Sequence, residues 1–325
     1  MWRRTLVLVL AAILVGSVLI HPAQGKEYPS QTIEVLCPFT AGGSFDLYSR
    51  LIADILPKYL GQPMVVIDKP GGAGTTIIAD MLNSKPDGYK LGILDAAYFS
   101  TAVKTQKVPF DPRNVIPLNT FLELKLGLTV RGDAPWKTLD DLLDYAKKNP
   151  AKLKWGHSGR GLTSYMNTRI IFEKAGIKTI DIPYKGSPES IAALLGGHVD
   201  AISQPHGAIK GHIQSGAMRY LVVYSDRRYG DPSDVPCAKE IGFPEAAKLM
   251  PLLGVWVHKD TPPEVKMILT NAFKKAFLDP EFKKGIEKIG DEPVFGEPNL
   301  MLDLIKKQEE VSVPILKELG IYVGN

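Results

Sequence analysis

Cysteine is scarce in this chain, which has two among its 325 residues. Two cysteines cannot form a disulfide framework, and no CxxC pair is present to indicate a zinc site. Cys37 and Cys237 either form one disulfide in an oxidising compartment or stay separate buried thiols, and the sequence leaves both open. Excess charge is also lacking, because 39 basic and 35 acidic residues give a net charge of +4. This balance does not indicate a nucleic-acid partner.

The motifs of several enzyme classes are missing. A P-loop needs a lysine and then Ser or Thr after its last glycine, but Gly74 is followed by Thr75 and Thr76. The dinucleotide fingerprint GxGxxG and the GxSxG elbow of α/β-hydrolases are absent as well. The six histidines have no HExxH spacing. The sequence therefore predicts no catalytic residue, no cofactor and no metal site.

The first 25 residues have the pattern of a secretory signal. Arg3 and Arg4 precede an uncharged apolar run over residues 6–20, and Ala23-Gln24-Gly25 offers small residues for cleavage. This run is shorter than the ~20 residues that a membrane-spanning helix needs. We predict a cleaved signal peptide over 1–25 and a periplasmic mature chain from Lys26. The alternative is an uncleaved N-terminal anchor.

Short apolar runs alternate with helical periodicity along the rest of the chain. This alternation predicts an α/β fold with parallel sheets. The expected strands cover residues 33–37, 64–67, 89–94, 124–130, 153–157, 179–183, 199–203, 220–224 and 254–258. The expected helices cover residues 44–59, 75–83, 139–148, 187–195, 263–290 and 299–319, with another that begins at Thr163 or Ser164.

Three of the predicted strand-to-helix turns are rich in Gly, Ser and Thr, over residues 40–44, 70–75 and 156–164. Such turns expose backbone N–H groups at the positive end of a helix dipole and are suited to bind an anion. Ligands of open α/β sheets lie at the carboxyl ends of the strands, where these turns fall. Turns in separate halves of the chain predict a cleft that holds an anion from two sides.

The ordered motifs of the chain resemble those of a known family. They are Tyr28-Pro29, residues 38–46 (PFTAGGSFD), residues 69–74 (KPGGAG), residues 86–89 (PDGY), residues 156–161 (GHSGRG), residues 183–187 (PYKGS) and residues 195–200 (LGGHVD). From about Tyr28 to the C-terminus the sequence resembles the periplasmic receptors of tripartite tricarboxylate transporters, also called Bug receptors.

The resemblance implies a two-lobed, type II-like periplasmic binding protein in which each lobe is a mostly parallel sheet flanked by helices. We expect lobe 1 to hold residues 26–125 and 251–325 and lobe 2 to hold residues 126–250, with hinge strands over 124–130 and 254–258.

The resemblance also implies a function. The chain would be a monomer that captures a small organic anion, such as a dicarboxylate or an aromatic acid, between its lobes. It would deliver this anion to the membrane permease subunits of a secondary transporter. The alternatives are a sensor that signals to a membrane kinase and, less favoured, a secreted hydrolase.

The expected ligand loop of lobe 1 runs from Phe39 to Asp46. Its predicted site residues are Phe39, Thr40, Ala41, Gly42, Gly43, Ser44 and Asp46. The amides near residues 42–44 would hold a carboxylate, and Ser44 would cap the following helix. Asp46 would accept a hydrogen bond from a ligand hydroxyl or, alternatively, stabilise the first helical turn.

The expected loop of lobe 2 supplies the other end of the site. Its residues are His157, Ser158, Gly159, Arg160, Gly161, Thr163 and Ser164, with Tyr184, Gln204, His206 and Tyr98 as further wall residues. Arg160 would form a bidentate pair with a second ligand carboxylate, or remain a solvated loop charge. Gln204 stands where many relatives have an acid, which argues against an amino-acid ligand because no carboxylate would await its ammonium.

Overall fold

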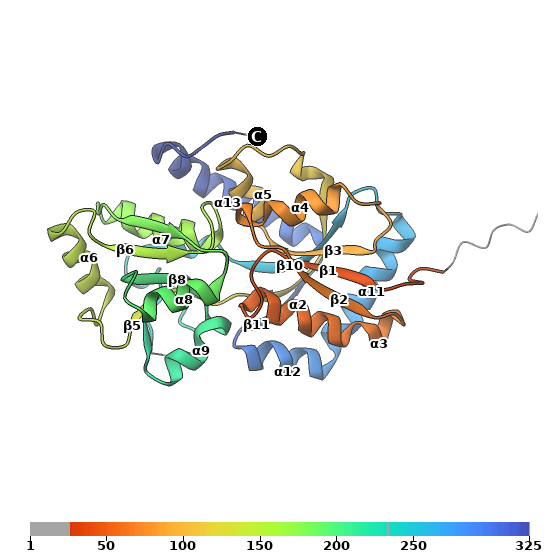
Figure 1. The fold of residues 1–325 in the computed structure, drawn as a ribbon, viewed down its shortest axis with the longest axis horizontal. Helices are drawn as coiled ribbons and strands as arrows, with labels where there is room; N and C mark the ends of the chain where they lie inside the picture. The colour runs from red at the N-terminus through yellow and green to blue at the C-terminus, as the bar shows by residue number, and fades with distance from the viewer. Residues whose placement is uncertain (1–26, 233, 325) are drawn as a thin grey trace, which may run out of the picture.

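A computed structural model describes residues 27–232 and 234–324, so the predicted signal peptide lies outside the described residues. The chain forms two lobes side by side (Figure 1). One lobe combines the red-to-orange start of the chain with its blue end, and the yellow-green middle forms the other. Within the described residues no helix is long and apolar enough to cross a membrane.

A six-stranded sheet in the order β11-β4-β10-β3-β1-β2 forms the centre of lobe 1. Its strands are β1 Ile33–Cys37, β2 Met64–Asp68, β3 Lys90–Asp95, β4 Val115–Glu123, β10 Leu252–His258 and β11 Glu292–Gly296. The pairs β1–β2 and β1–β3 are parallel, whereas β10 is antiparallel to both β3 and β4. Its helices are α2 Ser44–Ile55, α3 Pro57–Leu60, η1 Gly72–Gly74, α4 Thr75–Leu82, α5 Ala97–Ser100, η2 Ala102–Lys104, η3 Pro112–Asn114, α11 Pro263–Leu278, α12 Pro280–Ile289 and α13 Pro298–Glu318.

A five-stranded sheet in the order β7-β6-β8-β5-β9 forms the centre of lobe 2. Its strands are β5 Leu126–Arg131, β6 Lys154–His157, β7 Ile180–Pro183, β8 Ala201–Pro205 and β9 Met218–Val223. Its helices are α6 Leu139–Lys148, α7 Thr163–Lys174, α8 Ser187–Leu195, α9 His206–Gln214 and α10 Pro244–Ala247. Strand β6 is parallel to β7 and β8, and β5 is antiparallel to β8 and β9. These sheet memberships support the proposed division into lobe 1 (26–125 and 251–325) and lobe 2 (126–250).

The predicted two-lobed α/β fold is confirmed, with one correction to the sheets. Both are mixed and not mostly parallel, because β10, formed when the chain returns to lobe 1, and β5, the first strand of lobe 2, each run antiparallel to their neighbours. The sequence analysis also missed β4 and β11. Pro117 interrupts the apolar run of β4 and Pro293 lies in the edge strand β11, and proline inside a run argues against a strand.

The chain crosses from lobe 1 to lobe 2 at Leu124 and Lys125, between β4 and β5. Strands β5 and β10 each belong to one sheet, so the predicted hinge strands do not run through both lobes. Asp291 fixes the crossing, since its Oδ1 accepts the Lys125 N–H at 2.6 Å and its Oδ2 accepts the Tyr48 hydroxyl. Burial raises the pKa of Asp291 to about 6.

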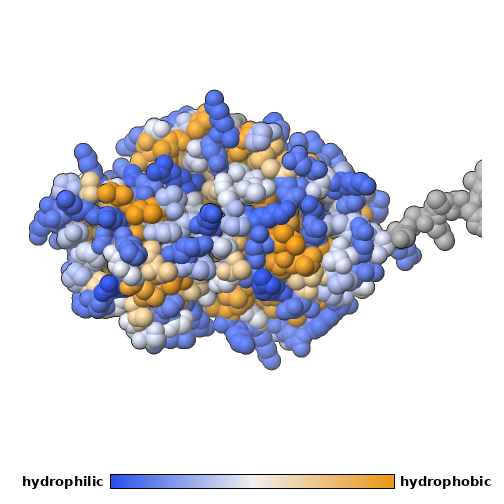
Figure 2. All heavy atoms as spheres, in the orientation of Figure 1, coloured by the Kyte–Doolittle hydropathy of each residue, from blue (hydrophilic) through white to orange (hydrophobic). Residues whose placement is uncertain are grey.

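Each lobe has a buried apolar interior beside its sheet. In lobe 2, Trp155 packs on Tyr165 and Phe172, and in lobe 1 Trp256 stacks on Phe99 with ring centroids 3.9 Å apart. Burial of apolar surface is the largest favourable term of folding, at roughly 25 cal/mol per Å², and these large aromatic side chains contribute to it. On the face seen in Figure 2, apolar patches are separated by hydrophilic side chains.

Cys37 and Cys237 are both free and buried. Cys37 is the last residue of β1 in lobe 1, whereas the backbone of Cys237 forms an isolated β-bridge with that of Val223 in lobe 2. Of the two alternatives that the sequence left open, the structure has two separate thiols.

Candidate functional site

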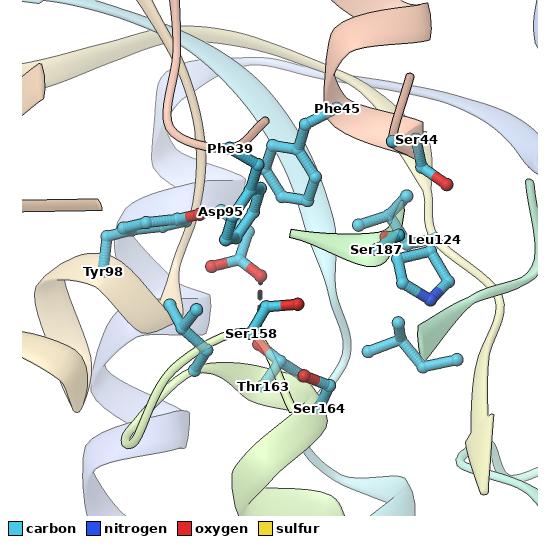
Figure 3. A pocket seen from close by; sticks show the side chains of 14 residues that line it. Phe39, Ser44, Phe45, Asp95, Tyr98, Leu124, Ser158, Thr163, Ser164 and Ser187 are labelled. Carbon is cyan, nitrogen blue, oxygen red and sulfur yellow. Dashed lines mark hydrogen bonds between the residues drawn. The ribbon is translucent and has the colours of Figure 1, made fainter. Parts of the chain in front are cut away.

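A small cavity lies between the lobes, and both contribute its walls (Figure 3). Lobe 1 supplies Phe39, Gly43, Ser44, Phe45, Asp95, Tyr98 and Leu124, and lobe 2 supplies Leu126, Ser158, Leu162, Thr163, Ser164, Ser187 and Pro205. The centre of a water molecule can occupy about 30 Å³ of this cavity. At 10–15 Å³ for each water, this is room for about two or three water molecules.

Three helices begin at this cavity: α2 from lobe 1, and α7 and α8 from lobe 2. The sequence predicts hydroxyl residues at their N-caps, but the caps are Gly43, Leu162 and Gly186. Ser44, Thr163 and Ser187 are instead the first helical residues and line the cavity. The first amides of a helix have no partner inside it, so three positive helix ends converge on one space.

Two buried hydroxyl groups at the cavity lack hydrogen-bond partners among the described residues. They are Ser44 Oγ and the Tyr98 hydroxyl, and each side chain is 1% exposed. A buried hydroxyl without a partner costs about 1–3 kcal/mol. Together with the helix N-termini, these groups form a donor-rich site for a negatively charged group.

Gln204 orients two further hydroxyls of the lining. Its Oε1 accepts from Ser187 Oγ at 2.7 Å, and its Nε2 donates to Ser158 Oγ at 3.2 Å. The Ser158 oxygen therefore accepts from Gln204 while its own O–H is directed elsewhere. Gln204 is fully buried and is not itself part of the lining, so it acts through the serines.

Asp95 is a lining residue that the sequence analysis missed. It ends β3, and its carboxylate accepts the Ala97 N–H at 2.9 Å and the Thr163 hydroxyl at 3.0 Å. Burial raises the pKa of Asp95 to about 6 in spite of these hydrogen bonds. The expectation from Gln204 that no carboxylate would await a ligand ammonium is therefore wrong, because Asp95 lines the cavity. Asp95 directly follows the predicted strand over residues 89–94, and this position at the carboxyl end of a strand could have identified it as a site residue.

A larger groove of about 520 Å³ adjoins the cavity at the edge of the cleft. It is lined by Pro38, Phe39, Gly71, Gly72, Ala73, Gly74, Thr105, Gln106, Ser158, Gly159, Arg160, Pro183, Tyr184 and Lys185. Phe39 and Ser158 line both spaces, so they form the wall between them. The second of the three predicted glycine-rich turns, residues 70–75, thus faces the groove and not the cavity.

The lobe 1 loop, residues 39–46, divides into lining and supporting residues. Phe39, Gly43 and Ser44 line the cavity, and Ala41 is exposed outside it. Thr40 Oγ1 lies 3.0 and 3.1 Å from the two carboxylate oxygens of Glu189, a contact between the lobes.

Asp46 supports the lobe 1 loop and does not line the cavity. Its Oδ2 accepts the Gly42 N–H at 2.8 Å, and Arg50 Nε lies 2.8 Å from its Oδ1. The Gly42 N–H, which the sequence predicts to hold a ligand carboxylate, is therefore already paired with Asp46 within the loop. The alternative in which Asp46 stabilises the first helical turn fits these contacts.

The lobe 2 loop, residues 156–164, is supported from behind by Asp181 of β7. Asp181 Oδ2 lies 3.2 Å from His157 Nε2 and accepts from Arg160 Nε at 2.9 Å. Burial would raise the pKa of Asp181, but the hydrogen bonds from His157 and Arg160 outweigh it and lower that pKa.

His157 is fully buried, and its Nδ1 accepts the Gly159 N–H at 3.0 Å. Burial lowers the pKa of His157, so the neutral ring is favoured. His157 therefore shapes the loop from inside lobe 2, and Arg160 lines the outer groove with Asp181 as its partner. Neither residue lines the cavity.

The remaining predicted residues also lie outside the cavity. The carbonyl oxygen of Gly161 accepts the Thr101 hydroxyl across the cleft, and Tyr184 lines the groove. His206 is buried next to Tyr220, with 3.3 Å between Nδ1 and the hydroxyl, and burial lowers the pKa of His206 to about 4. Ser158, Thr163 and Ser164 line the cavity, and their contact with a ligand stays a prediction. Within residues 27–232 and 234–324, no three His, Cys, Asp or Glu side chains are grouped to hold a metal ion.

The comparison with known families agrees with this two-lobed cleft. Residues 48–321 match the tripartite tricarboxylate transporter family receptor, TctC. The chain belongs to this family. Its members are solute-binding receptors, and this receptor is accordingly an extracytoplasmic protein.

Individual relatives and structures are similar over nearly the whole receptor. The UPF0065 protein in gbd 5'region of Cupriavidus necator is 32% identical over 302 residues, which are 92% of this chain and 90% of that protein. The periplasmic binding protein BugD has a TM-score of 0.84 at 28% identity, covering 91% of this chain and 99% of BugD. The R. palustris protein Rpa4515 with adipate also has a TM-score of 0.84, at 26% identity and with the same coverage.

Proposed function

We propose that this receptor captures a small organic carboxylate in the cavity between its lobes and delivers it to the permease subunits of a membrane secondary transporter. The observation that carries the proposal is the convergence of three helix N-termini, from both lobes, on one cavity with unpaired buried hydroxyls. The similar structure of R. palustris Rpa4515 with adipate supports a carboxylate as the ligand class. The receptor is proposed to act without catalysis, as a monomer, after cleavage of a signal peptide over 1–25.

The position of Arg160 does not support a second carboxylate on the ligand, because Arg160 does not line the cavity. Arg160 lies on the outer groove, and Asp181 already accepts from its Nε. The proposal is therefore limited to one carboxylate, held by the Ser44 and Ser158 hydroxyls and the first-turn amides of α2, α7 and α8.

Binding in this cavity requires the lobes to move apart. The volume that water centres can occupy in the cavity, about 30 Å³, is too small for a four-carbon acid. The same volume of the adjoining groove is about 520 Å³. Lobe opening with later closure on the ligand is the ordinary movement of this fold. Contacts such as Thr40–Glu189 and Thr163–Asp95 would break and re-form in each cycle.

A thermal-shift screen of organic acids tests the proposal. A ligand that binds only the folded state at one hundred times its Kd adds about 2.7 kcal/mol of stability. We expect at least one small carboxylate to raise the Tm, and the matching primary amides at equal concentration not to do so. Absence of any hit in a broad set of acids would overturn the proposal.

Delivery to a permease needs an experiment in cells. A sensor of the same ligand would use the same cleft, so binding does not separate the two functions. We expect deletion of the permease genes to abolish receptor-dependent uptake of the labelled acid. Unchanged uptake would contradict delivery and leave the kinase-sensor alternative.

A further inference from the structure

Asp95 is an acid placed inside a site that is otherwise built for an anion. It is 4% exposed and lies at the end of β3, where Figure 3 shows its carboxylate pointing into the space between Phe39, Tyr98 and Ser158. Its hydrogen bonds to the Ala97 amide and the Thr163 hydroxyl use part of its capacity, since a carboxylate accepts about four. Because Asp95 lines the cavity, its remaining acceptor capacity is available to a bound group.

No cation balances this carboxylate within the part of the chain that the structure describes. The lining contains no Lys, Arg or His, and Asp95 takes part in none of the ion pairs of the described residues. Much of the surrounding wall is apolar, from Phe45, Leu124, Leu126, Leu162 and Pro205. Burying an unpaired carboxylate in such a place is unfavourable, and burial accordingly raises the pKa of Asp95 to about 6.

The cavity therefore offers donors and an acceptor to the same ligand. The donors are the free hydroxyls of Ser44 and Tyr98 and the N-termini of α2, α7 and α8. The acceptor is Asp95, and Tyr98 is the other titratable residue of the lining. A dicarboxylate would bring a second negative charge into a small cavity that already contains a carboxylate, whereas an ammonium group would neutralise it.

On the basis of the proposed function, we propose that Asp95 makes the receptor selective for a zwitterion, whose carboxylate binds at the helix N-termini and whose ammonium pairs with Asp95. Such a ligand satisfies both kinds of group that the cavity presents. This names the ligand class as an amino acid and not a dicarboxylate.

Three matched series of linear acids with three to six carbons test this inference. Their far ends carry a methyl, a carboxylate or an ammonium group, and binding is measured by calorimetry at pH 8. We expect the tightest ammonium compound to bind at least about tenfold more tightly than the dicarboxylate of the same length. Asp95→Asn should remove this preference, and Asp133→Asn, at an exposed carboxylate outside the cavity, should leave it unchanged.

Proton linkage gives a measurement that does not depend on a variant. At pH 6.5 an ammonium beside Asp95 lowers its pKa, so binding should release protons to the buffer. A monocarboxylate with a methyl end should instead take protons up, because it brings negative charge near Asp95. Calorimetry in two buffers of different ionisation enthalpy separates the two results.

The outcomes are distinct. Dicarboxylates that bind the unmodified receptor as tightly as the ammonium series, or a preference that survives Asp95→Asn, would overturn the zwitterion inference and leave the proposed function standing. Binding of none of the three series would overturn this inference, and the broad thermal-shift screen of organic acids would then decide separately whether the proposed function stands.

Discussion

The lobe 1 loop and the lobe 2 loop have similar glycine-rich sequences, but their glycines meet different demands. At Gly43 of the lobe 1 loop, φ is −83° and an added Cβ would meet nothing closer than 3.5 Å. At Gly159 and Gly161 of the lobe 2 loop, φ is 155° and 80°, and an added Cβ would lie 2.7 Å from Ala73 and Ala102 of the opposite lobe. Glycine therefore presents helix amides in one loop and permits the lobes to approach in the other.

The two loops also differ in how they are held. Asp46 supports the lobe 1 loop from within its own first helical turn, through Gly42 and Arg50. Asp181 supports the lobe 2 loop from a different strand, through His157 and Arg160. The lobe 2 loop thus depends on tertiary structure for its shape, and the lobe 1 loop depends on local structure.

Gly161→Ala should have the largest effect and tests the first difference. The Cβ of the new alanine would clash with the backbone of Ala102, so the two lobes should close less completely on a ligand. The affinity for the ligand should therefore fall about tenfold or more, which corresponds to ~1.4 kcal/mol. Calorimetry with an acid identified by thermal shift measures the loss, and X-ray scattering should show a less compact liganded form.

Gly176→Ala is the matched control for this variant. Gly176 has a similar φ of 66°, but an added Cβ there would meet nothing within 4 Å. It therefore reproduces the backbone strain without the contact between lobes. If both variants bind the acid equally well, the lobe 2 loop glycines do not limit closure.

Asp181→Asn should come next and tests the second difference. It weakens the hydrogen bonds that Asp181 accepts from His157 and Arg160, so the free energy of unfolding at pH 7 should fall by about 1–2 kcal/mol. Urea unfolding measures the change. Asp133→Asn, at an exposed pair with Arg131, should change it far less. Equal losses would mean that the lobe 2 loop does not depend on Asp181.

The contributions of His157 and Asp181 to the pH profile have a definite sign, whereas the raised pKa values of Asp95 and Asp291 act in the opposite direction between about pH 4 and 6. Folding lowers the pKa of His157 from 6.5 and that of Asp181 from 3.8, so the unfolded chain binds more protons at each group. Their contributions to stability are complete above about pH 6.5 and decrease on acidification, first through His157 and below pH 3.8 through Asp181. The Asp181→Asn profile should lack the second decrease.

Ser44→Ala should have a smaller effect and is specific to the lobe 1 loop. Because Ser44 Oγ has no partner among the described residues, its removal should leave the Tm unchanged or slightly raised. Loss of one hydrogen bond to a ligand carboxylate should weaken affinity by about 1 kcal/mol, roughly fivefold. A drop in Tm with unchanged affinity would assign Ser44 a structural role.

Arg160→Ala should have the smallest effect. The Arg160 side chain is 52% exposed and its Nε is paired with Asp181, and such exposed pairs contribute about 0–1 kcal/mol. We expect monocarboxylates and dicarboxylates to lose affinity equally. A selective loss of dicarboxylates in calorimetry would restore the bidentate role that the sequence suggested for Arg160.

Local sequence signals predicted most of the strands and helices in order, though not β4, β11 or α9, and they predicted the position of the cavity at the strand-to-helix turns. The lining itself was harder to predict, because Asp95, Phe45 and Ser187 face the cavity only once the two lobes pack together. Asp46 was ambiguous, although Arg50 lies four residues later at the spacing of a helical ion pair.

His157 and Arg160 looked like ligand residues because their partner, Asp181, lies 24 and 21 residues further along the chain. The sequence does not show that β6 and β7 are neighbours in register, which is what brings Asp181 behind the loop. Pairings between distant segments therefore decide which residues of a motif face the ligand.

The two buried, unpaired thiols have a practical consequence. Cys37 and Cys237 lie in different lobes and are not bonded to each other, so no disulfide restrains the separation of the lobes and the fold requires no oxidation step. Production in a reducing cytosol should therefore yield the same molecule. Because maleimide dyes reach buried thiols poorly, one engineered surface cysteine per lobe would accept a fluorophore pair and report the opening and closing of single receptors in real time.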